Sequence, residues 1–263
     1  MDGLLEGKTV FLAASTKGLG YGVALESARQ GARVSLGSRN EEHLEEALKL
    51  LSEETGADAF GFRLDASDHE SIGEWIEASL SHFGTVDCLV TNAGGPPAGF
   101  FEDFNDDHWQ QAFELTLMST VRMIRKVLPV MKKKGSGSIV TMTSSSVKEP
   151  IDILLLSNVM RSGVTSLAKS LSFELAPFGI RVNNLVPGRF DTDRVRYLDT
   201  HQARAAGVSM ENIKAEKEQG IPLGRYGTPD EFGKAAAFLL SDSASYITGE
   251  TLVIDGGAMR TVW

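Results

Sequence analysis

The first structural signal in this chain is the stretch Val10-Phe11-Leu12-Ala13-Ala14-Ser15-Thr16-Lys17-Gly18-Leu19-Gly20. Its first four residues form a short apolar run, which predicts a buried strand. Its glycines predict a tight turn that opens a helix running from about Gly18 to Gln30. In such a turn the backbone can approach a pyrophosphate closely, and the free N–H groups of the helix favour an anion. The stretch therefore predicts either a nucleotide-binding turn or a plain tight turn in which helix and strand pack closely.

Strand and helix patterns alternate along the rest of the chain. Apolar runs predict the strands, and segments rich in Glu, Leu, Ala and Lys between them favour helices. The further expected strands are Arg33–Leu36, Ala59–Phe62, Cys88–Thr91, Ser138–Met142, Val182–Val186 and Thr251–Ile254. The further expected helices are Glu41–Ser52, Ser71–His82, Asp107–Lys133, Leu154–Leu175 and Pro229–Leu240. This order predicts an α/β fold, namely a doubly wound (Rossmann) parallel sheet of about seven strands with helices on both faces.

No linker, repeat or low-complexity tract interrupts this alternation, so residues 1–263 are predicted to form a single domain. The least regular stretch is 189–220, which is rich in charge and lacks a clear period. Because it follows the sixth strand of a doubly wound sheet, we expect it to form helices that cover a site as a substrate lid. A surface excursion without a role in binding is the alternative.

Composition argues against several classes of function. The formal net charge of −9, with acids spread along the chain, argues against a nucleic-acid partner, whose phosphates need a basic face. The one cysteine, Cys88, lies in an apolar run, which favours a buried thiol over a nucleophile. The sequence shows no metal-ligand spacing, and no apolar run approaches the ~20 residues of a membrane helix. We therefore expect no metal and no membrane partner, and, from the lack of a targeting signal at Met1–Lys8, a cytoplasmic protein.

Further motifs stand at the ends of the expected strands. Asn92-Ala93-Gly94 follows the fourth strand, Pro187-Gly188 follows the sixth, and Thr248-Gly249 and Asp255-Gly256-Gly257 flank the last. Together with the first turn, these motifs resemble the short-chain dehydrogenase/reductase family over nearly the whole chain, with Ala14 in place of the family's first turn glycine. The resemblance implies cofactor contacts from Ala14, Ser15, Thr16, Lys17, Gly18, Leu19 and Gly20 in the phosphate turn, from Asp65 at the adenine, from Asn92, Ala93 and Gly94, and from Pro187, Gly188, Phe190 and Thr192 at the nicotinamide.

The turn after the second strand bears on the choice of cofactor. An Asp or Glu there would bond a ribose 2′-hydroxyl and repel a 2′-phosphate, but this chain has Ser38 followed by Arg39. Lys17 adds a second cation, and an Arg can grip a phosphate with two parallel hydrogen bonds. In NADP-preferring members of the family, basic residues at these two positions hold the 2′-phosphate. We therefore expect NADP(H) to bind in preference to NAD(H); two solvated surface charges are the alternative.

The family's catalytic group is altered in this chain. The resemblance places Ser144 at the family's substrate-orienting Ser and Thr116 at its Asn, while Ser157 falls at its Tyr and Arg161 at its Lys. Ser157 and Arg161 are four residues apart on an expected helix, so they share a face. A serine is a poor proton donor near neutral pH, and a guanidinium stays charged, although it can still hold ribose hydroxyls. We expect these four residues to be the catalytic ones.

The cofactor motifs predict an NADP(H)-dependent oxidoreductase that acts on a small carbonyl or alcohol. A resemblance to 3-oxoacyl-acyl-carrier-protein reductase-like members of the family supports a distinct subgroup. Other groups could donate the proton, although each is also explained as a surface residue: Tyr197, Asp191, His201, Glu149 and Asp152. The alternatives are a protein that binds NADP(H) without redox turnover, as a sensor or partner subunit, and a lyase or isomerase on the same fold.

The expected helix Leu154–Leu175 carries more apolar side chains than one contact face needs, Leu167 and Leu171 among them. In the family this helix packs against a second subunit and the last strand against a third, so the resemblance implies a homotetramer, or a dimer. Leucines that simply face the sheet are the alternative. A partly apolar substrate pocket is expected from Gly95–Phe101, Val195, Tyr197, Met210 and Ile213.

Overall fold

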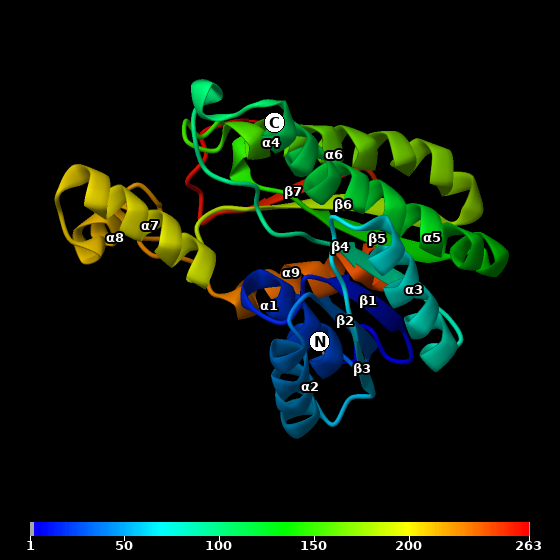
Figure 1. The fold of residues 1–263 in the computed structure, drawn as a ribbon. Coiled ribbons are helices and arrows are strands. Elements are labelled where there is room, and N and C mark those ends of the chain that lie inside the picture. Colours follow the sequence, from blue (N-terminus) through cyan, green and yellow to red (C-terminus); the bar gives the residue numbers. More distant parts are fainter. Residues whose placement is uncertain (1–2, 263) are drawn as a thin grey trace.

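The computed structural model describes residues 3–262, and its centre is a sheet of seven parallel strands (Figure 1). The strands lie in the order β3-β2-β1-β4-β5-β6-β7, and every neighbouring pair is parallel. Their bounds are β1 Thr9–Ala13, β2 Arg33–Ser38, β3 Ala59–Arg63, β4 Cys88–Thr91, β5 Gly137–Met142, β6 Ile180–Pro187 and β7 Thr251–Ile254. This order confirms the predicted doubly wound α/β fold.

The helices fall between the strands as predicted, with one difference: the segment expected as one helix over Asp107–Lys133 is divided by a π-helical stretch, η2 (Phe113–Met118). The stretch 189–220 forms two helices, in agreement with the expected helical segment. The α-helices are α1 Gly18–Arg29, α2 Glu41–Thr55, α3 His69–Phe83, α4 Asp106–Ala112, α5 Ser119–Lys134, α6 Leu155–Leu175, α7 Asp193–Ala206, α8 Met210–Gln219 and α9 Pro229–Leu240. Short 3₁₀ turns are η1 Phe101–Asp103, η3 Ser145–Val147, η4 Ala176–Phe178 and η5 Asp242–Ala244.

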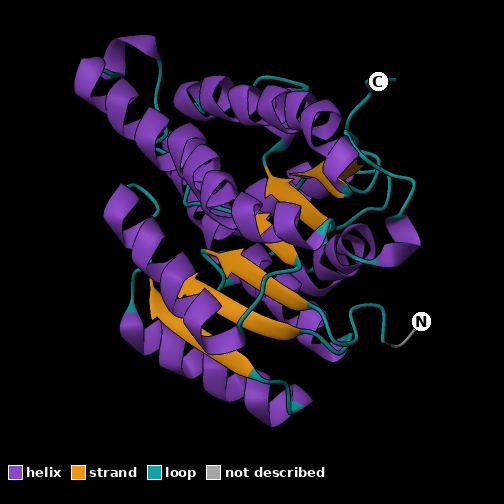
Figure 2. Ribbon diagram, turned by 90° about the vertical axis from the view of Figure 1, so that its right-hand side faces the viewer, coloured by secondary structure: helices purple, strands orange, loops and turns teal. Residues whose placement is uncertain are grey.

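Helices cover both faces of the sheet, as Figure 2 shows. Successive side chains of a strand point to opposite faces, so Val10 and Leu12 of β1 pack against α1, α2 and α9. Phe11 and Ala13 of the same strand pack against α3, α5 and α6. Alternate residues of the run Val10–Ala13 therefore belong to two hydrophobic cores, so every position in the run is apolar.

Two glycines allow α1 and α9 to cross closely beneath the sheet. A Cβ atom on Gly22 would lie 2.3 Å from the carbonyl oxygen of Pro229. A Cβ on Gly233 would lie 2.3 Å from the carbonyl oxygen of Gly22, so neither position accepts a side chain without a shift of backbone. This contact fixes α1, and with it the position of the helix N-terminus that follows β1.

Helices α7 and α8 stand out from the body of the molecule (Figure 1). The side chain of Asp199 in α7 is buried, with 1% of the residue exposed. It accepts hydrogen bonds from Arg189 at 2.7 Å and from the hydroxyl of Tyr226 at 2.8 Å. These two bonds tie α7 to the segments before and after the α7–α8 excursion.

Candidate functional site

A cavity of about 880 Å³ opens at the carboxyl ends of β1, β4, β5 and β6, beside α7. The strand order reverses between β1 and β4, and ligands of doubly wound sheets bind at such a point. Most of the predicted site residues line it: Ala14, Lys17, Gly18, Leu19, Gly20, Asn92, Ala93, Gly94, Ser144, Ser157, Arg161, Pro187, Gly188, Phe190 and Thr192. The others, Ser15, Thr16, Ser38, Arg39, Asp65 and Thr116, lie outside its lining.

The turn between β1 and α1 has the form that a phosphate cradle needs. Ala14 adopts a φ of +48°, the only positive value at a non-glycine position among residues 3–262. A Cβ atom on Gly20 would lie 2.2 Å from the carbonyl oxygen of Ala14, so this position accepts no side chain. Lys17, the N-cap of α1, makes no capping bond with its side chain, which leaves the first N–H groups of the helix available. These residues therefore fit a pyrophosphate at the helix N-terminus.

The loop after β4 forms the facing wall of the cavity. The side-chain amide of Asn92 donates a hydrogen bond to the carbonyl oxygen of Ala14 at 3.1 Å, which joins this loop to the phosphate turn. A Cβ atom on Gly94 would meet nothing within 4 Å, so this glycine borders open space. A cofactor can therefore lie against backbone on both sides of the switch point.

The predicted residues for the ribose and adenine form a contiguous group beside Lys17. The hydroxyls of Thr16 and Ser38 lie 3.1 Å apart, and the ammonium of Lys17 lies 2.9 Å from His43 Nε2. Hydrogen bonds from Ser67 lower the pKa of Asp65, and the charge of Arg39 lowers it further. The turn after β2 thus contacts the phosphate turn through Ser38 and carries one cation, Arg39. Ser15 belongs to the core, since its hydroxyl donates to the carbonyl oxygen of Leu12.

Three of the four predicted catalytic residues meet at one wall of the cavity. The guanidinium of Arg161 donates from Nε to Ser157 Oγ at 3.2 Å and from Nη1 to the carbonyl oxygen of Met142 at 3.0 Å. Ser144 Oγ accepts a hydrogen bond from the backbone N–H of Ser146 at 3.2 Å. Burial lowers the pKa of Arg161 to about 10, with a smaller contribution from the charge of Arg194. Arg161 therefore remains a cation at neutral pH.

Thr116 lies apart from these three residues. It is buried within the π-helical stretch η2, and its hydroxyl has no hydrogen-bond partner there. Single π-helical turns often occur near functional sites. A catalytic part for Thr116 stays a prediction, because the residue does not line the cavity.

Comparison with known proteins agrees with this geometry. A family model described as enoyl-(acyl carrier protein) reductase matches residues 13–259. The 3-oxoacyl-[acyl-carrier-protein] reductase FabG of Chlamydia trachomatis is 32% identical over 257 residues, which cover 98% of this chain and 99% of that protein. The chain belongs to the short-chain dehydrogenase/reductase family.

Solved structures of this family lie close to the present one. The L-sorbose reductase of Gluconobacter frateurii, in complex with NADPH and L-sorbose, superimposes with a TM-score of 0.94 at 28% identity over the whole of both chains. A variant of the actinorhodin polyketide ketoreductase with NADPH superimposes with a TM-score of 0.92 at 29% identity, covering 99% of this chain and 100% of that one. Both of these similar proteins are reductases, and both structures contain NADPH.

Several lining residues were not expected from the sequence, Arg194, Ile151, Ile153 and Leu198 among them. The last sequence motif ends at Thr192, and the sequence does not indicate which face of the following helix, α7, lies towards the cavity. Of the other possible proton donors, His201 and Asp152 line the cavity, whereas Tyr197, Asp191 and Glu149 do not. The expected apolar pocket is formed differently, since Val195 and Gly95 line it but Phe100, Phe101 and Tyr197 are exposed.

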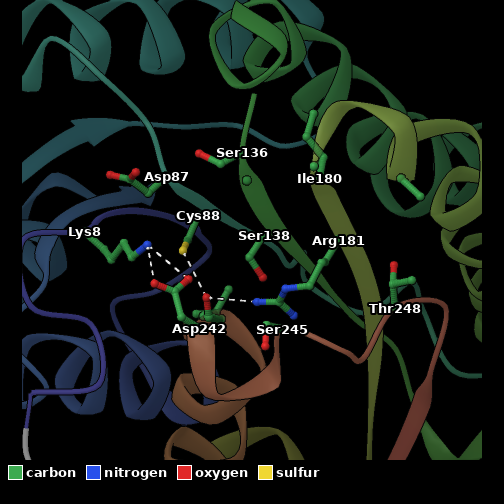
Figure 3. Close-up of a pocket in the computed structure, with 14 residues that line it drawn as sticks. Lys8, Asp87, Cys88, Ser136, Ser138, Ile180, Arg181, Asp242, Ser245 and Thr248 are labelled. Atoms are coloured by element: carbon green, nitrogen blue, oxygen red, sulfur yellow. Dashed lines mark hydrogen bonds and ion pairs between the residues drawn. The ribbon is translucent and has the colours of Figure 1, made fainter. Parts of the chain in front are cut away.

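A second cavity, of about 320 Å³, lies at the opposite, amino ends of the strands (Figure 3). Lys8 pairs with Asp242 at 3.0 Å, and Arg181 donates to the carbonyl oxygens of Leu239 and Ser241 at the end of α9. The thiol of Cys88 is buried here, as expected for a core cysteine, and burial raises its pKa to about 12. These polar groups bond to one another and join α9 to the sheet.

Between residues 3 and 262, no three His, Cys, Asp or Glu side chains are grouped so that they could hold a metal ion. Within the same range, no helix combines the length and the apolar composition that crossing a membrane requires.

Proposed function

We propose that this protein is an NADP(H)-dependent carbonyl reductase in which a serine–arginine pair stands where the family carries its usual proton donor. The observation that supports it most is the convergence of Ser144, Ser157 and Arg161 on the cavity that also holds the phosphate turn. A site with a cofactor cradle at one end and two hydroxyls at the other suits reduction of a carbonyl group.

Ser144 and Ser157 both line the cavity, and we propose that their hydroxyls together hold the carbonyl oxygen of the substrate. When bound, the reduced nicotinamide supplies the hydride that forms the new C–H bond at the carbonyl carbon. Ser144 accepts from the N–H of Ser146, and Ser157 accepts from Arg161, so each hydroxyl keeps its own proton free to donate. As the C=O π bond breaks, two such donors stabilise the negative charge that develops on the oxygen.

Arg161 makes Ser157 a better partner for that charge. A guanidinium that donates to a serine oxygen strengthens the bond from this hydroxyl to a third group, because charge-assisted bonds polarise the chain. The proton of Ser157 passes to the substrate oxygen as the alcohol forms, so the serine must then recover a proton from another group. Arg161 is charged at neutral pH, because its pKa is about 10, and we assign it to polarising Ser157. We propose that water in the cavity delivers this proton, with His201 and Asp152 on the same lining.

The choice of NADP(H) over NAD(H) is part of the proposal. It is supported by the cations Lys17 and Arg39 beside Ser38, and by the NADPH in the solved structures of two relatives. A 2′-phosphate beside these residues would find two positive partners and no acidic residue at position 38 or 39. We assign Asp65 to the adenine on the resemblance alone.

We also propose the predicted homotetramer, with a dimer as the smaller alternative, and a lid role for α7 and α8 within a single domain. Two apolar side chains on α6 support assembly: Phe173 is 73% exposed and Val159 is 48% exposed. Leu171, by contrast, packs into the core beneath the helix. Light scattering that gives a monomer at micromolar concentration would contradict the assembly.

The test follows NADPH oxidation with neutral ketones, aldehydes and 3-oxoacyl thioesters. We expect turnover in the wild type and a loss of about 100-fold in Ser144→Ala, the usual size of the effect of removing one donor to a developing oxyanion. Ser162→Ala, an exposed serine on the same helix as Ser157, is the matched control and should leave the rate unchanged. Calorimetry with NADPH runs in parallel. Binding without turnover of any carbonyl would favour a nucleotide-binding protein over the reductase.

A further inference from the structure

Two arginines face the main cavity without an acidic partner. Arg161 of α6 and Arg194 of α7 both line it. The bonds of Arg161 go to Ser157 and to the carbonyl oxygens of Met142 and Thr143. Arg194 donates to the carbonyl oxygen of Pro96 at 3.3 Å. Within residues 3–262, neither guanidinium forms an ion pair with Asp or Glu.

The neighbouring arginines behave differently. Arg189 pairs with Asp199, Arg196 pairs with Asp191 and Asp193, and Arg225 pairs with Glu231. Carboxylates near the lid therefore pair with several of the arginines around it. Arg161 and Arg194 line the cavity without such a partner, whereas Arg189, which also lines it, is neutralised by Asp199.

The electrostatics of the pair favour an anion between them. Burial lowers the pKa of Arg194, and burial together with the charge of Arg194 lowers that of Arg161. Two like charges that are near each other and partly removed from water destabilise one another. The acidic residues on the lining are exposed, and one of them, Asp193, is already bonded to Arg196. A negative ligand placed between the guanidinium groups would offset their repulsion.

Backbone contacts fix the positions of the two guanidinium groups in the cavity. Arg161 bonds to the carbonyl oxygens of Met142 and Thr143, which directly precede Ser144, so an anion at Arg161 lies next to the Ser144 hydroxyl. Arg194 rests on the loop after β4, where a Cβ atom on Gly95 would come within 3.1 Å of its Nη2. The arginine thus reaches from α7 across to the opposite wall.

We propose that the substrate carries a carboxylate next to its reacting carbonyl group, as in a 2-oxo acid, and that Arg161 and Arg194 hold this carboxylate. The proposal rests on the reductase function above and specifies its substrate class. Apolar side chains of Ile151, Ile153 and Leu198 line the same cavity and suit an apolar remainder of the molecule. A planar carboxylate matches the fork of a guanidinium better than a neutral ketone does.

The experiment compares matched pairs of ligands that differ in the carboxylate alone. Pyruvate is compared with acetone, and 2-oxo-4-phenylbutanoate with 4-phenyl-2-butanone, each titrated by calorimetry into protein saturated with NADP⁺. We expect the acids to bind about tenfold or more tightly than the ketones, as one charge-assisted pair provides. Arg194→Gln should remove this preference while NADP⁺ affinity stays within about twofold. Arg196→Gln, an exposed arginine on the same helix, is the matched control and should keep the preference.

The outcomes that would contradict the carboxylate site differ from those that would contradict the reductase. Equal binding of acid and ketone, or a preference that survives Arg194→Gln, would overturn it. Weaker NADP⁺ binding in Arg194→Gln would show that this arginine serves the cofactor's phosphates instead. NADPH oxidation, followed in parallel mixtures that contain NADPH in place of NADP⁺, keeps the two hypotheses apart. Preference for acids without oxidation would contradict the reductase and retain the anion site, whereas oxidation with ketones alone would retain the reductase and overturn the anion site.

Discussion

The buried carboxylate of Asp199 should hold α7 against the body of the molecule, and Asp199→Ala tests this. Asp199 is 1% exposed and accepts from Arg189 at 2.7 Å and from Tyr226 at 2.8 Å. Its removal takes away the acceptor that Arg189 and Tyr226 share and leaves only the 3.3 Å bond between them. Because the side chain of α7 residue Leu198 lines the cavity, we expect the change to reach the site.

The magnitude follows from burial. Removing one member of a fully buried ion pair costs about 3–5 kcal/mol. The side chain of Arg189 is 35% exposed, so water can solvate part of its charge and the cost falls to about 2–3 kcal/mol. With a factor of ten for each ~1.4 kcal/mol, the closed position of α7 should become roughly 30–150-fold less favoured.

Hydrogen exchange of the α7 amides is the assay. They should exchange roughly 30–150-fold faster in Asp199→Ala if the lid opens locally. Asp191→Ala is the matched control, because Asp191 also has two partners, the cations Arg196 and Lys214, but is 45% exposed. It should accelerate exchange less than about fivefold. Equal exchange in both variants would refute the argument that burial of Asp199 anchors the lid.

A second readout comes from Tyr226. Burial raises its pKa to about 12, and the bond to Asp199 contributes to this rise. The neutral phenol is favoured in the folded state, so its contribution to stability is present below pH ~10 and is lost as the pH rises towards about 12. In Asp199→Ala the phenol should ionise at lower pH, as followed by tyrosinate absorbance. An unchanged titration would place the cause in burial alone.

Three further predictions concern other parts of the chain. Hydrogen bonds from Arg225 and from the N–H of Thr228 lower the pKa of Glu231 to about 2. The contribution of Glu231 to the capping of α9 should therefore be fully present above pH ~4.3, the ordinary glutamate pKa, and should be lost as the pH falls towards 2. An NMR titration that gives this carboxyl an ordinary pKa would contradict the prediction. Arg39→Ala should weaken NADPH binding roughly 10–100-fold and leave NADH binding unchanged, with Lys49→Ala as an unaffected control; an equal loss for both cofactors would refute the 2′-phosphate assignment. Cys88 should resist thiol reagents in the native protein, because burial raises its pKa to about 12; rapid labelling without unfolding would contradict the core position.

Much of the fold could be predicted from local patterns. Apolar runs such as Val10–Ala13 are read directly because a parallel strand buries both faces, and Gly20 signals a turn that accepts no side chain. The positive φ at Ala14 agrees with its alignment to a family glycine. These features depend on residues that are adjacent in the chain, so local sequence patterns are sufficient to predict them.

The parts that could not be predicted depend on contacts between distant residues. The π-helical stretch has ordinary helical composition, and hydroxyls of Ser119 and Thr120 bond back to carbonyl oxygens within it. Asp199 and Tyr226 are 27 residues apart, and nothing local links them. Arg194 has no motif, and its part in the cavity is set by how α7 packs over the loop after β4.

The most direct test of the central claim is transfer of deuterium from labelled NADPH to the carbonyl carbon, measured by mass spectrometry of the alcohol product over ketones and 2-oxo acids. We expect labelled alcohol with the wild type and about 100-fold less with Ser144→Ala. The reductase function would be contradicted if the wild type bound NADPH but transferred no deuterium, while the double variant Ser157→Tyr/Arg161→Lys did.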